Sequence, residues 1–153
     1  MQAIKLILWI FIWQVPMWMG AQIAMNNMDW YHTLSRPFFS PPDWIFGPVW
    51  AILYVLLALA GFCITRKGLN ADNRKATWLM IAQLVLNAAW TPLFFGMHHL
   101  MGAMALVVAM IGMTIWLMRA AWRTSRMAVW LLMPYLAWLC FAWLLNTNMW
   151  LMN

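Results

Sequence analysis

Long apolar runs alternate with short polar connections along the whole chain. Five uncharged, mostly apolar stretches cover approximately residues 6–25, 44–65, 76–95, 100–118 and 127–148. Each is close to the ~20 residues that an α-helix needs to cross the hydrocarbon core of a bilayer. Helices are expected because every backbone amide in lipid must be paired within its own segment, and the alternation typical of a membrane barrel is missing. The pattern predicts an all-α membrane protein, a five-helix up-and-down bundle forming one domain over residues 1–153.

The composition agrees with a membrane protein. Apolar residues make up 67% of the chain and charged residues 8%, whereas soluble domains average about 25% charged residues. The net charge of +6 sits in short clusters between the apolar runs and forms no basic face, so no nucleic-acid partner is expected. Cys63 and Cys140 both fall inside apolar runs, where they predict no disulfide framework.

The distribution of Lys and Arg predicts the direction of the chain through the membrane. Eight of these residues fall on one side of a five-span arrangement: Lys5, Arg66, Lys67, Arg74, Lys75, Arg119, Arg123 and Arg126. The other side carries Arg36 alone. Because positive residues accumulate in cytoplasmic connections, we expect a cytoplasmic N-terminus and an outside C-terminus, in a bacterial inner membrane.

The first outside connection, residues 26–43, is too long and too aromatic to be a simple tether. Asp29 is expected to cap a short helical turn that runs through Leu34. Three prolines then stiffen the return stretch. They are Pro37, Pro41 and Pro42. This connection is interpreted as a lid over the bundle, and the alternative is a loop that lies on lipid headgroups.

Most of the fourteen tryptophans fit the aromatic belts found at membrane surfaces. The belt candidates, close to span ends, are Trp78, Trp116, Trp122, Trp130 and Trp150. Trp50, Trp90 and Trp138 are deeper, roughly 9, 9 and 15 Å below the outer ends of the second, third and fifth spans at 1.5 Å per residue. Three helices therefore bring indoles to similar depths.

Two amides share a helical face with Trp90 in the third span. Gln83 and Asn87 precede it at spacings that place all three side chains on one side of the helix. Such amides either join helices together or contact a ligand, and the sequence leaves both alternatives open. Asn87, next to Trp90, is the better ligand candidate.

Prolines interrupt the third and fifth spans. Pro134 is expected on one face with Trp138 and Leu145, and both Pro134 and Pro92 leave a backbone carbonyl without its helical donor. Breaks of this kind are tolerated where a neighbour or a cavity satisfies the carbonyl. Together with the deep indoles, they predict a cavity in the outer half of the bundle that suits a large, flat, apolar ligand.

Ionisable groups that could perform chemistry are scarce. No Asp or Glu lies within a span, which argues against proton relays and ion-coupled transport. His98 and His99 are adjacent and cannot share one helical face, so no metal site is expected, although axial haem ligation by either of them or by His32 stays open.

Several motifs, taken in order, cover nearly the whole chain. They are Trp30-Tyr31 to Pro37, Ser40-Pro41-Pro42, Trp44, Phe46, Pro48-Val49-Trp50, Tyr54, Gln83, Asn87, Trp90-Thr91-Pro92, Phe94-Phe95, Pro134-Tyr135-Leu136-Ala137-Trp138 and Leu145-Asn146. This combination resembles the TspO/MBR family, the tryptophan-rich sensory proteins related to the mitochondrial translocator protein, formerly the peripheral benzodiazepine receptor.

The resemblance implies a pocket beneath the first loop that binds porphyrins, such as protoporphyrin IX or haem, and no obligatory cofactor. The residues expected to bind ligand are Tyr31, Pro41, Pro42, Phe46, Trp50, Gln83, Asn87, Trp90, Trp138, Ala142 and Leu145. Trp50 and Trp138 match indoles that are linked in bacterial relatives to light-dependent porphyrin breakdown. The family's sterol motif is not met, because no Lys or Arg follows Tyr135.

The leading hypothesis is a membrane receptor or sensor with tetrapyrrole and lipid partners. The alternatives are light-dependent porphyrin degradation and facilitated transport of tetrapyrroles or lipids. A homodimer is also expected, because the third and fourth spans contain small residues that allow helices to pack closely. The sequence does not predict which helix face forms the contact. Those residues are Ala82, Ala88, Ala89, Ala105, Ala109 and Gly112.

Overall fold

The computed structural model describes residues 2–153, which contain helices and no β-strand. Five long helices dominate: α1 (Gln2–Asn26), α3 (Asp43–Thr65), α4 (Ala71–Thr91), α5 (Leu100–Ala121) and α6 (Arg126–Met152). A short helix α2 (Met28–Thr33) follows α1, and a π-helix η1 (Pro92–Gly96) continues α4. Within the described chain, five helical segments, with α4 and η1 joined, are long and apolar enough to cross a membrane. The predicted five-helix membrane bundle is confirmed.

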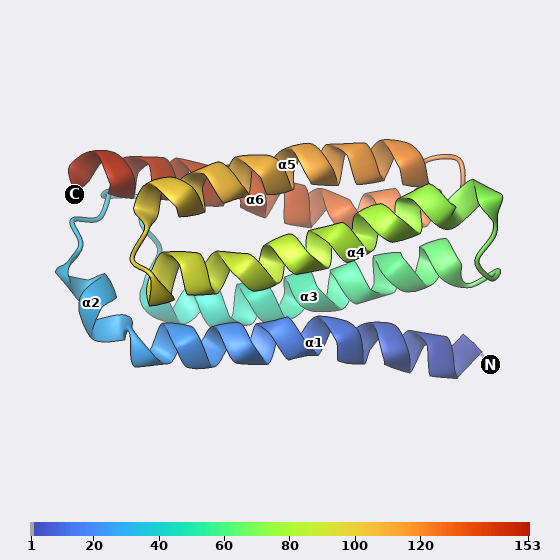
Figure 1. Cartoon of the computed structure of the whole chain (residues 1–153), viewed down its shortest axis with the longest axis horizontal. Coiled ribbons are helices and arrows are strands. Elements are labelled where there is room, and N and C mark those ends of the chain that lie inside the picture. The colour runs from blue at the N-terminus through green and yellow to red at the C-terminus, as the bar shows by residue number, and fades with distance from the viewer. Residues whose placement is uncertain (1) are drawn as a thin grey trace.

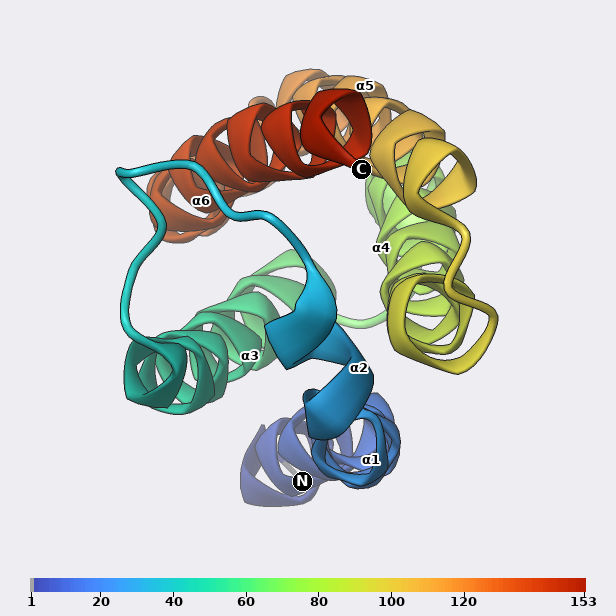
Figure 2. The ribbon, with the colours of Figure 1, turned by 90° about the vertical axis from the view of Figure 1, so that its left-hand side faces the viewer.

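The long helices run antiparallel (Figure 1) and form a ring when viewed along the bundle (Figure 2). The order around the ring is α1, α3, α6, α5 and α4, with α4 returning to α1. The N-terminus, the α3–α4 connection and the α5–α6 connection share one end, which we call the basic end. Helix α2 and the C-terminus occupy the opposite end, which we call the lid end. The helices at the short connections are neighbours as expected, whereas the contact between α3 and α6 joins distant parts of the sequence.

Most helices extend beyond the apolar runs that identify them in the sequence. Helix α4 begins at Ala71, five residues before the predicted span, because Asn70 and Asn73 form a reciprocal capping box. The Ser125 hydroxyl caps α6 by accepting from the amide of Ala128 at 3.3 Å. Hydropathy marks where lipid begins, whereas these caps mark where the helix begins.

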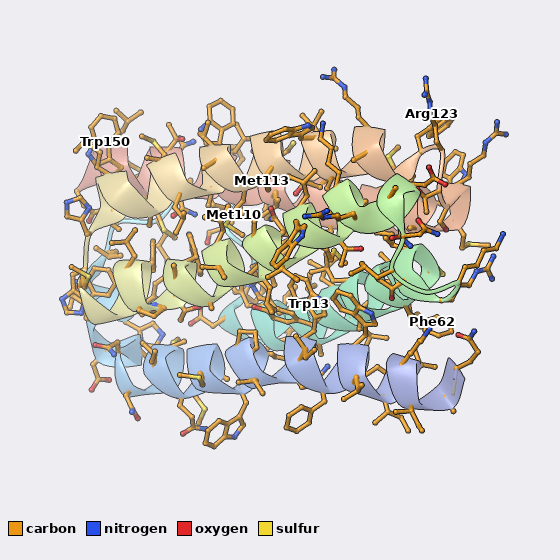
Figure 3. The ribbon with its side chains drawn as sticks, turned by 45° about the vertical axis from the view of Figure 1, so that its right-hand side comes forward. Trp13, Phe62, Met110, Met113, Arg123 and Trp150 are labelled. Carbon is orange, nitrogen blue, oxygen red and sulfur yellow. The ribbon has the colours of Figure 1, made fainter. Side chains whose placement is uncertain are left out.

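The half of the bundle toward the basic end is tightly packed. Trp13 of α1 is completely buried in the middle of the bundle (Figure 3) and lies 5.8 Å from the ring of Tyr54. Around it are further side chains with almost no exposed surface. They include Leu57, Ile64, Met80, Leu117 and Leu132. Contacts of this kind, each small, hold the helices together in a solvent that offers little hydrophobic driving force.

The tryptophans expected in the membrane belts are exposed on the outside of the bundle. The exposed set is Trp78, Trp116, Trp122, Trp130 and Trp150. Figure 3 shows Trp150 on the outer surface near the lid end. This outcome matches the expected belts, in which indoles meet both the headgroups and the acyl chains.

Two local expectations are corrected. Helix α2 begins at Met28 and ends at Thr33, so Asp29 lies within its first turn and is not the cap. Pro134 does not interrupt its span, because helix α6 continues through it; it lies one turn before Trp138 on adjoining positions of the helix, but is exposed and outside the cavity lining. Pro92 does alter the backbone, because the α-helix becomes a π-helix there and the amide of Met97 donates to the Pro92 carbonyl at 2.8 Å.

Candidate functional site

The first connection closes the lid end of the ring (Figure 2), where α2 and the following coil cross above the helices. Tyr31 of α2 points inward and is 4% exposed. Its ring lies 6.3 Å from that of Phe94 and 5.6 Å from that of Phe95. Trp30, next to Tyr31, stacks on the ring of His98 at 3.9 Å. The connection therefore packs onto the bundle, which favours the predicted lid over a loop lying on headgroups.

An ionic cluster holds the lid to the start of α3. The Asp43 carboxylate lies 2.6 Å from the Arg36 guanidinium and 2.8 Å from Nε2 of His32. Arg36 also lies over the ring of Tyr31, 5.2 Å from its centroid. The contact of Arg36 with Tyr31, ahead of that with Asp43, raises the pKa of this guanidinium despite its partial burial, so Arg36 stays charged. The Asp43 carboxylate, where the lid meets α3, thus binds both α2, through His32, and the coil that follows α2, through Arg36.

A second attachment joins the lid to α6. The side chain of Asn153 accepts from the amide of Ser35 at 2.9 Å and donates to the carbonyl of Ser35 at 3.0 Å. Further along the lid, the ring of Phe39 meets that of Phe141 at 6.4 Å. The lid therefore contacts α3 through charges and α6 through an amide and an aromatic pair.

A cavity of about 350 Å³ lies beneath the lid, within the size range of small-molecule pockets. Its predicted lining residues are Tyr31, Phe46, Trp50, Asn87, Trp90, Trp138, Ala142 and Leu145. The rest of the lining comes from α1 and from neighbouring positions of the other elements: Pro16, Met17, Gly20, Ala21, Ala24, Met25, Met28, Asp43, Gly47, Tyr54, Thr91, Phe94, Phe95, Asn146 and Met149. Most of these side chains are apolar or aromatic.

Indoles from three helices meet around the cavity. The ring of Trp50 on α3 lies 6.5 Å from that of Trp90 on α4 and 6.4 Å from that of Trp138 on α6. Phe46 lies edge-on to Trp138 at 6.0 Å, and Trp90 stacks on Phe94 at 5.1 Å. Flat aromatic surfaces in several orientations therefore bound one space, as the depths of the three tryptophans predict.

Four buried polar atoms in the cavity lining have no hydrogen-bond partner among residues 2–153. Two are indole donors, Nε1 of Trp90 and Nε1 of Trp138. The other two are amide acceptors, Oδ1 of Asn87 and Oδ1 of Asn146. These atoms are closed to water in this structure, so a guest reaches them only after a small shift of the side chains. Because leaving a buried polar group unpaired costs about 1–3 kcal/mol, pairing them would then favour a guest that brings both acceptors and donors.

A polar layer lies below the cavity. The Tyr135 hydroxyl accepts from Nε2 of Gln83 at 2.5 Å and from Nδ2 of Asn87 at 2.8 Å, which joins α4 to α6. All three residues are buried. The amides therefore join helices, as one of the two alternatives predicts. Asn87 also lines the cavity, and its contact with a ligand stays a prediction.

Three residues expected to bind ligand lie outside the lining. Gln83 is completely buried in the polar layer, one helical turn below Asn87. Pro41 and Pro42 immediately precede α3 and shape the end of the lid. Gln83 therefore affects the cavity through the position of Asn87. Pro41 and Pro42 affect it through the position of the lid.

The α1 side of the cavity was missed by the sequence reasoning. Pro16, Gly20 and Ala24 recur every four residues and therefore form one narrow stripe on the helix. Gly20 lets α1 approach α4 closely, since a Cβ atom there would lie 3.0 Å from the Thr91 hydroxyl. This i, i+4 spacing of small residues is the signal from which that wall could have been found.

The three histidines lie outside the cavity lining, and each has another contact. His32 pairs with Asp43, and His98 stacks on Trp30. Nδ1 of His99 accepts from the amide of Gly102 at 2.9 Å and caps α5. Within residues 2–153, no three His, Cys, Asp or Glu side chains gather as metal ligands.

Comparison with known proteins agrees with this architecture. The model of the TspO/MBR family matches residues 6–151. The chain is 35% identical to the tryptophan-rich protein TspO of Archaeoglobus fulgidus over 131 residues, which cover 85% of this chain and 84% of that protein. It is 36% identical to the translocator protein of Bos taurus over 135 residues, covering 86% and 80% of the two chains. It is 36% identical to the tryptophan-rich sensory protein of Cereibacter sphaeroides over 115 residues, covering 72% and 68%. The chain is a membrane protein that belongs to the TspO/MBR family.

Proposed function

We propose that this protein is a membrane receptor or sensor that binds a porphyrin in the cavity beneath the lid. The observation that carries the proposal is the convergence of Trp50, Trp90 and Trp138 on one enclosed space, with unpaired donors and acceptors beside them. Relatives named as sensory and translocator proteins support a membrane role in sensing or transport.

The shape and chemistry of the lining suit a flat, conjugated ring. Indole faces and edges stack favourably against an aromatic macrocycle, and such contacts add about 0.5–1.5 kcal/mol each beyond area burial. The amide oxygens of Asn87 and Asn146 suit the O–H of a protonated propionic acid group or a water molecule at the ring edge, because the pyrrole N–H groups of a porphyrin point into the macrocycle. The indole donors of Trp90 and Trp138 suit the carboxylates of a porphyrin. An apolar guest without polar groups would leave these four atoms unpaired.

Titration of protoporphyrin IX into the detergent-purified protein tests this proposal. We expect saturable quenching of tryptophan fluorescence at micromolar ligand, because three indoles border the cavity. The Asn87→Leu variant should bind more weakly, whereas Asn148→Leu, which changes a half-buried amide on α6 outside the cavity lining, should bind normally. Unchanged fluorescence, or equal affinity in the two variants, would count against the proposal.

Light-dependent porphyrin degradation is a second candidate function. It is favoured by the edge-on contact of Trp50 with Trp138, which puts two oxidisable indoles side by side at the cavity. Illumination of the porphyrin complex in air should bleach the pigment, and Trp50→Phe or Trp138→Phe should slow the bleaching. The same rate in both variants and in the unaltered protein would exclude an indole role.

The dense packing below the cavity favours binding over passage through the bundle. Trp13, Leu57 and Leu132 fill the space between the polar layer and the basic end. Transport would therefore need a rearrangement of these side chains or a route along the outer surface. Porphyrin flux into liposomes that equals the flux into empty vesicles would exclude transport.

We also propose that the basic end faces the cytoplasm, in a bacterial inner membrane. The proposal rests on the eight Lys and Arg side chains at that end against Arg36 at the lid end. Single cysteines at Lys67 and Phe38, in a Cys63→Ala, Cys140→Ala background, test it in intact cells. An impermeant thiol reagent should label the cysteine at position 38 only, and labelling at position 67 only would reverse the assignment.

Dimer formation through α5 is a further part of the proposal. Ala105, Ala109 and Gly112 lie on the exposed side of α5, where small side chains permit close helix approach. Mass measurement in mild detergent tests it. Gly112→Leu should then shift a dimer toward the monomer, and a mass that matches the monomer before any substitution would oppose the proposal.

A further inference from the structure

A groove of about 490 Å³ lies between α5 and α6 at the basic end, separate from the cavity beneath the lid. Helix α5 contributes Ile115 and Arg119, the turn after α5 contributes Arg123, and α6 contributes Trp130 and Met133. These five side chains are all exposed on the outside of the ring. The groove therefore faces the bilayer and not the interior of the bundle.

The groove changes from apolar to cationic along its length. Ile115 lies six residues, or about 9 Å, before the end of α5 at Ala121, and Arg123 follows in the turn beyond that end. Helix α6 runs in the opposite direction, so Met133 lies toward the middle of the bundle and Trp130 nearer its end. Figure 3 shows Arg123 projecting from the basic end. Lipid molecules have the same polarity, with acyl chains toward the middle of the membrane and a headgroup at its surface.

Two guanidinium groups in the groove lack a counter-charge within residues 2–153. Arg119 lies in the last turn of α5 and Arg123 in the turn that follows, and both side chains border the groove, so two like charges lie along one side of it. The ion pairs of the described chain both involve Asp43, at the opposite end. Arg126, by contrast, lies over the ring of Trp122 at 5.5 Å and steadies this wall of the groove.

We propose that this groove binds an anionic glycerophospholipid. The guanidinium forks of Arg119 and Arg123 match the geometry of the phosphate and relieve their own repulsion. An acyl chain lies against Ile115 and Met133, and the exposed indole of Trp130 lies near the headgroup. Basic pockets between membrane helices commonly bind anionic lipids in this manner.

Topology alone does not account for the arrangement. Arg66 and Arg74 lie at the same basic end and are also exposed, yet neither borders the groove. They carry the same charge without an adjoining apolar channel. They are therefore the matched control positions for a test of the site.

Native mass spectrometry of the purified full chain tests the proposal, with phosphatidylglycerol and phosphatidylcholine of identical acyl chains. We expect the unaltered protein to retain phosphatidylglycerol roughly ten- to thirty-fold more strongly, from two basic contacts. The Arg119→Gln, Arg123→Gln double variant should lose this preference, and the Arg66→Gln, Arg74→Gln variant should keep it. Trp130→Ala should weaken both lipids. The conservative Arg119→Lys, Arg123→Lys variant should keep part of the preference and serves if the glutamine variant is unstable.

Three results would overturn the proposal. One is equal retention of the two lipids by the unaltered protein. Another is an equal loss in the control variant, which would indicate a general effect of the charge at this end. The third is displacement of bound phosphatidylglycerol by millimolar inorganic phosphate, because the site would then recognise the anion without the acyl chain.

Discussion

The indole of Trp138 meets that of Trp50 edge-on, with ring centroids 6.4 Å apart and an interplanar angle of 85°. The two rings belong to α6 and α3, helices that are neighbours in the ring but far apart in the chain. Their contact forms one corner of the cavity, and Phe46 extends the same wall. Substitutions in this wall should therefore change ligand affinity more than they change the fold.

Truncation of Trp138 should weaken porphyrin binding. We expect Trp138→Ala to raise the dissociation constant about tenfold or more, because the guest loses an aromatic wall and an indole donor, and 1.4 kcal/mol corresponds to a factor of ten. Fluorescence titration with protoporphyrin IX measures the change. Trp143→Ala is the control, because Trp143 is on the same helix and outside the lining. A similar loss of affinity in both variants would mean that the effect is general to α6.

Removal of the Tyr135 hydroxyl should destabilise the bundle. Tyr135→Phe leaves Gln83 and Asn87 without a shared acceptor, and we expect a loss of about 1–2 kcal/mol in the free energy of unfolding. The thermal unfolding midpoint in detergent checks this expectation. Tyr54→Phe is the matched control, since Tyr54 is buried in the same core and is outside the polar layer. If the two variants and the unaltered protein have the same thermal unfolding midpoint, the polar layer contributes no stability.

Neutralisation of Asp43 should loosen the lid. Asp43→Asn weakens the pairs with Arg36 and His32, so amides in residues 28–42 should exchange hydrogen for deuterium several-fold faster. Asp29→Asn removes the same charge from an exposed position on α2 and should leave exchange unchanged. Equal exchange in the two variants would show that the aromatic contacts of Tyr31 suffice to hold the lid.

A methyl group at Gly61 should separate α1 from α3. A Cβ atom at this position would lie 2.6 Å from the indole of Trp9, whose Nε1 donates to the Thr65 hydroxyl at 2.8 Å. Because that hydrogen bond restrains the ring, we expect Gly61→Ala to lower stability by about 1–3 kcal/mol. Gly47→Ala, also in α3, meets no atom within 4 Å and should be neutral or slightly stabilising. Thermal unfolding of the pair tests the contrast, and equal midpoints would show that Trp9 yields without cost.

Hydropathy and charge sufficed to predict the five spans and the difference between the two ends. Both properties depend on how each segment meets a bilayer, and that solvent acts on every helix separately. Helical periodicity added Asn87 and Trp90 on one face, and the depths of Trp50 and Trp138 were also predictable from their positions in the spans. These are local features, readable one helix at a time.

The tertiary structure alone decided which helices are neighbours, and therefore what surrounds the indoles. It placed α1 against the cavity, buried Trp13 completely and left Pro134 exposed outside the cavity lining. It also gave the two amides different surroundings. Gln83 lies in the polar layer only, whereas Asn87 lies in that layer and also borders the cavity. An apolar side chain is equally soluble in lipid and in the protein core, so the hydrophobic pattern cannot distinguish the two. Packing between helices makes that choice.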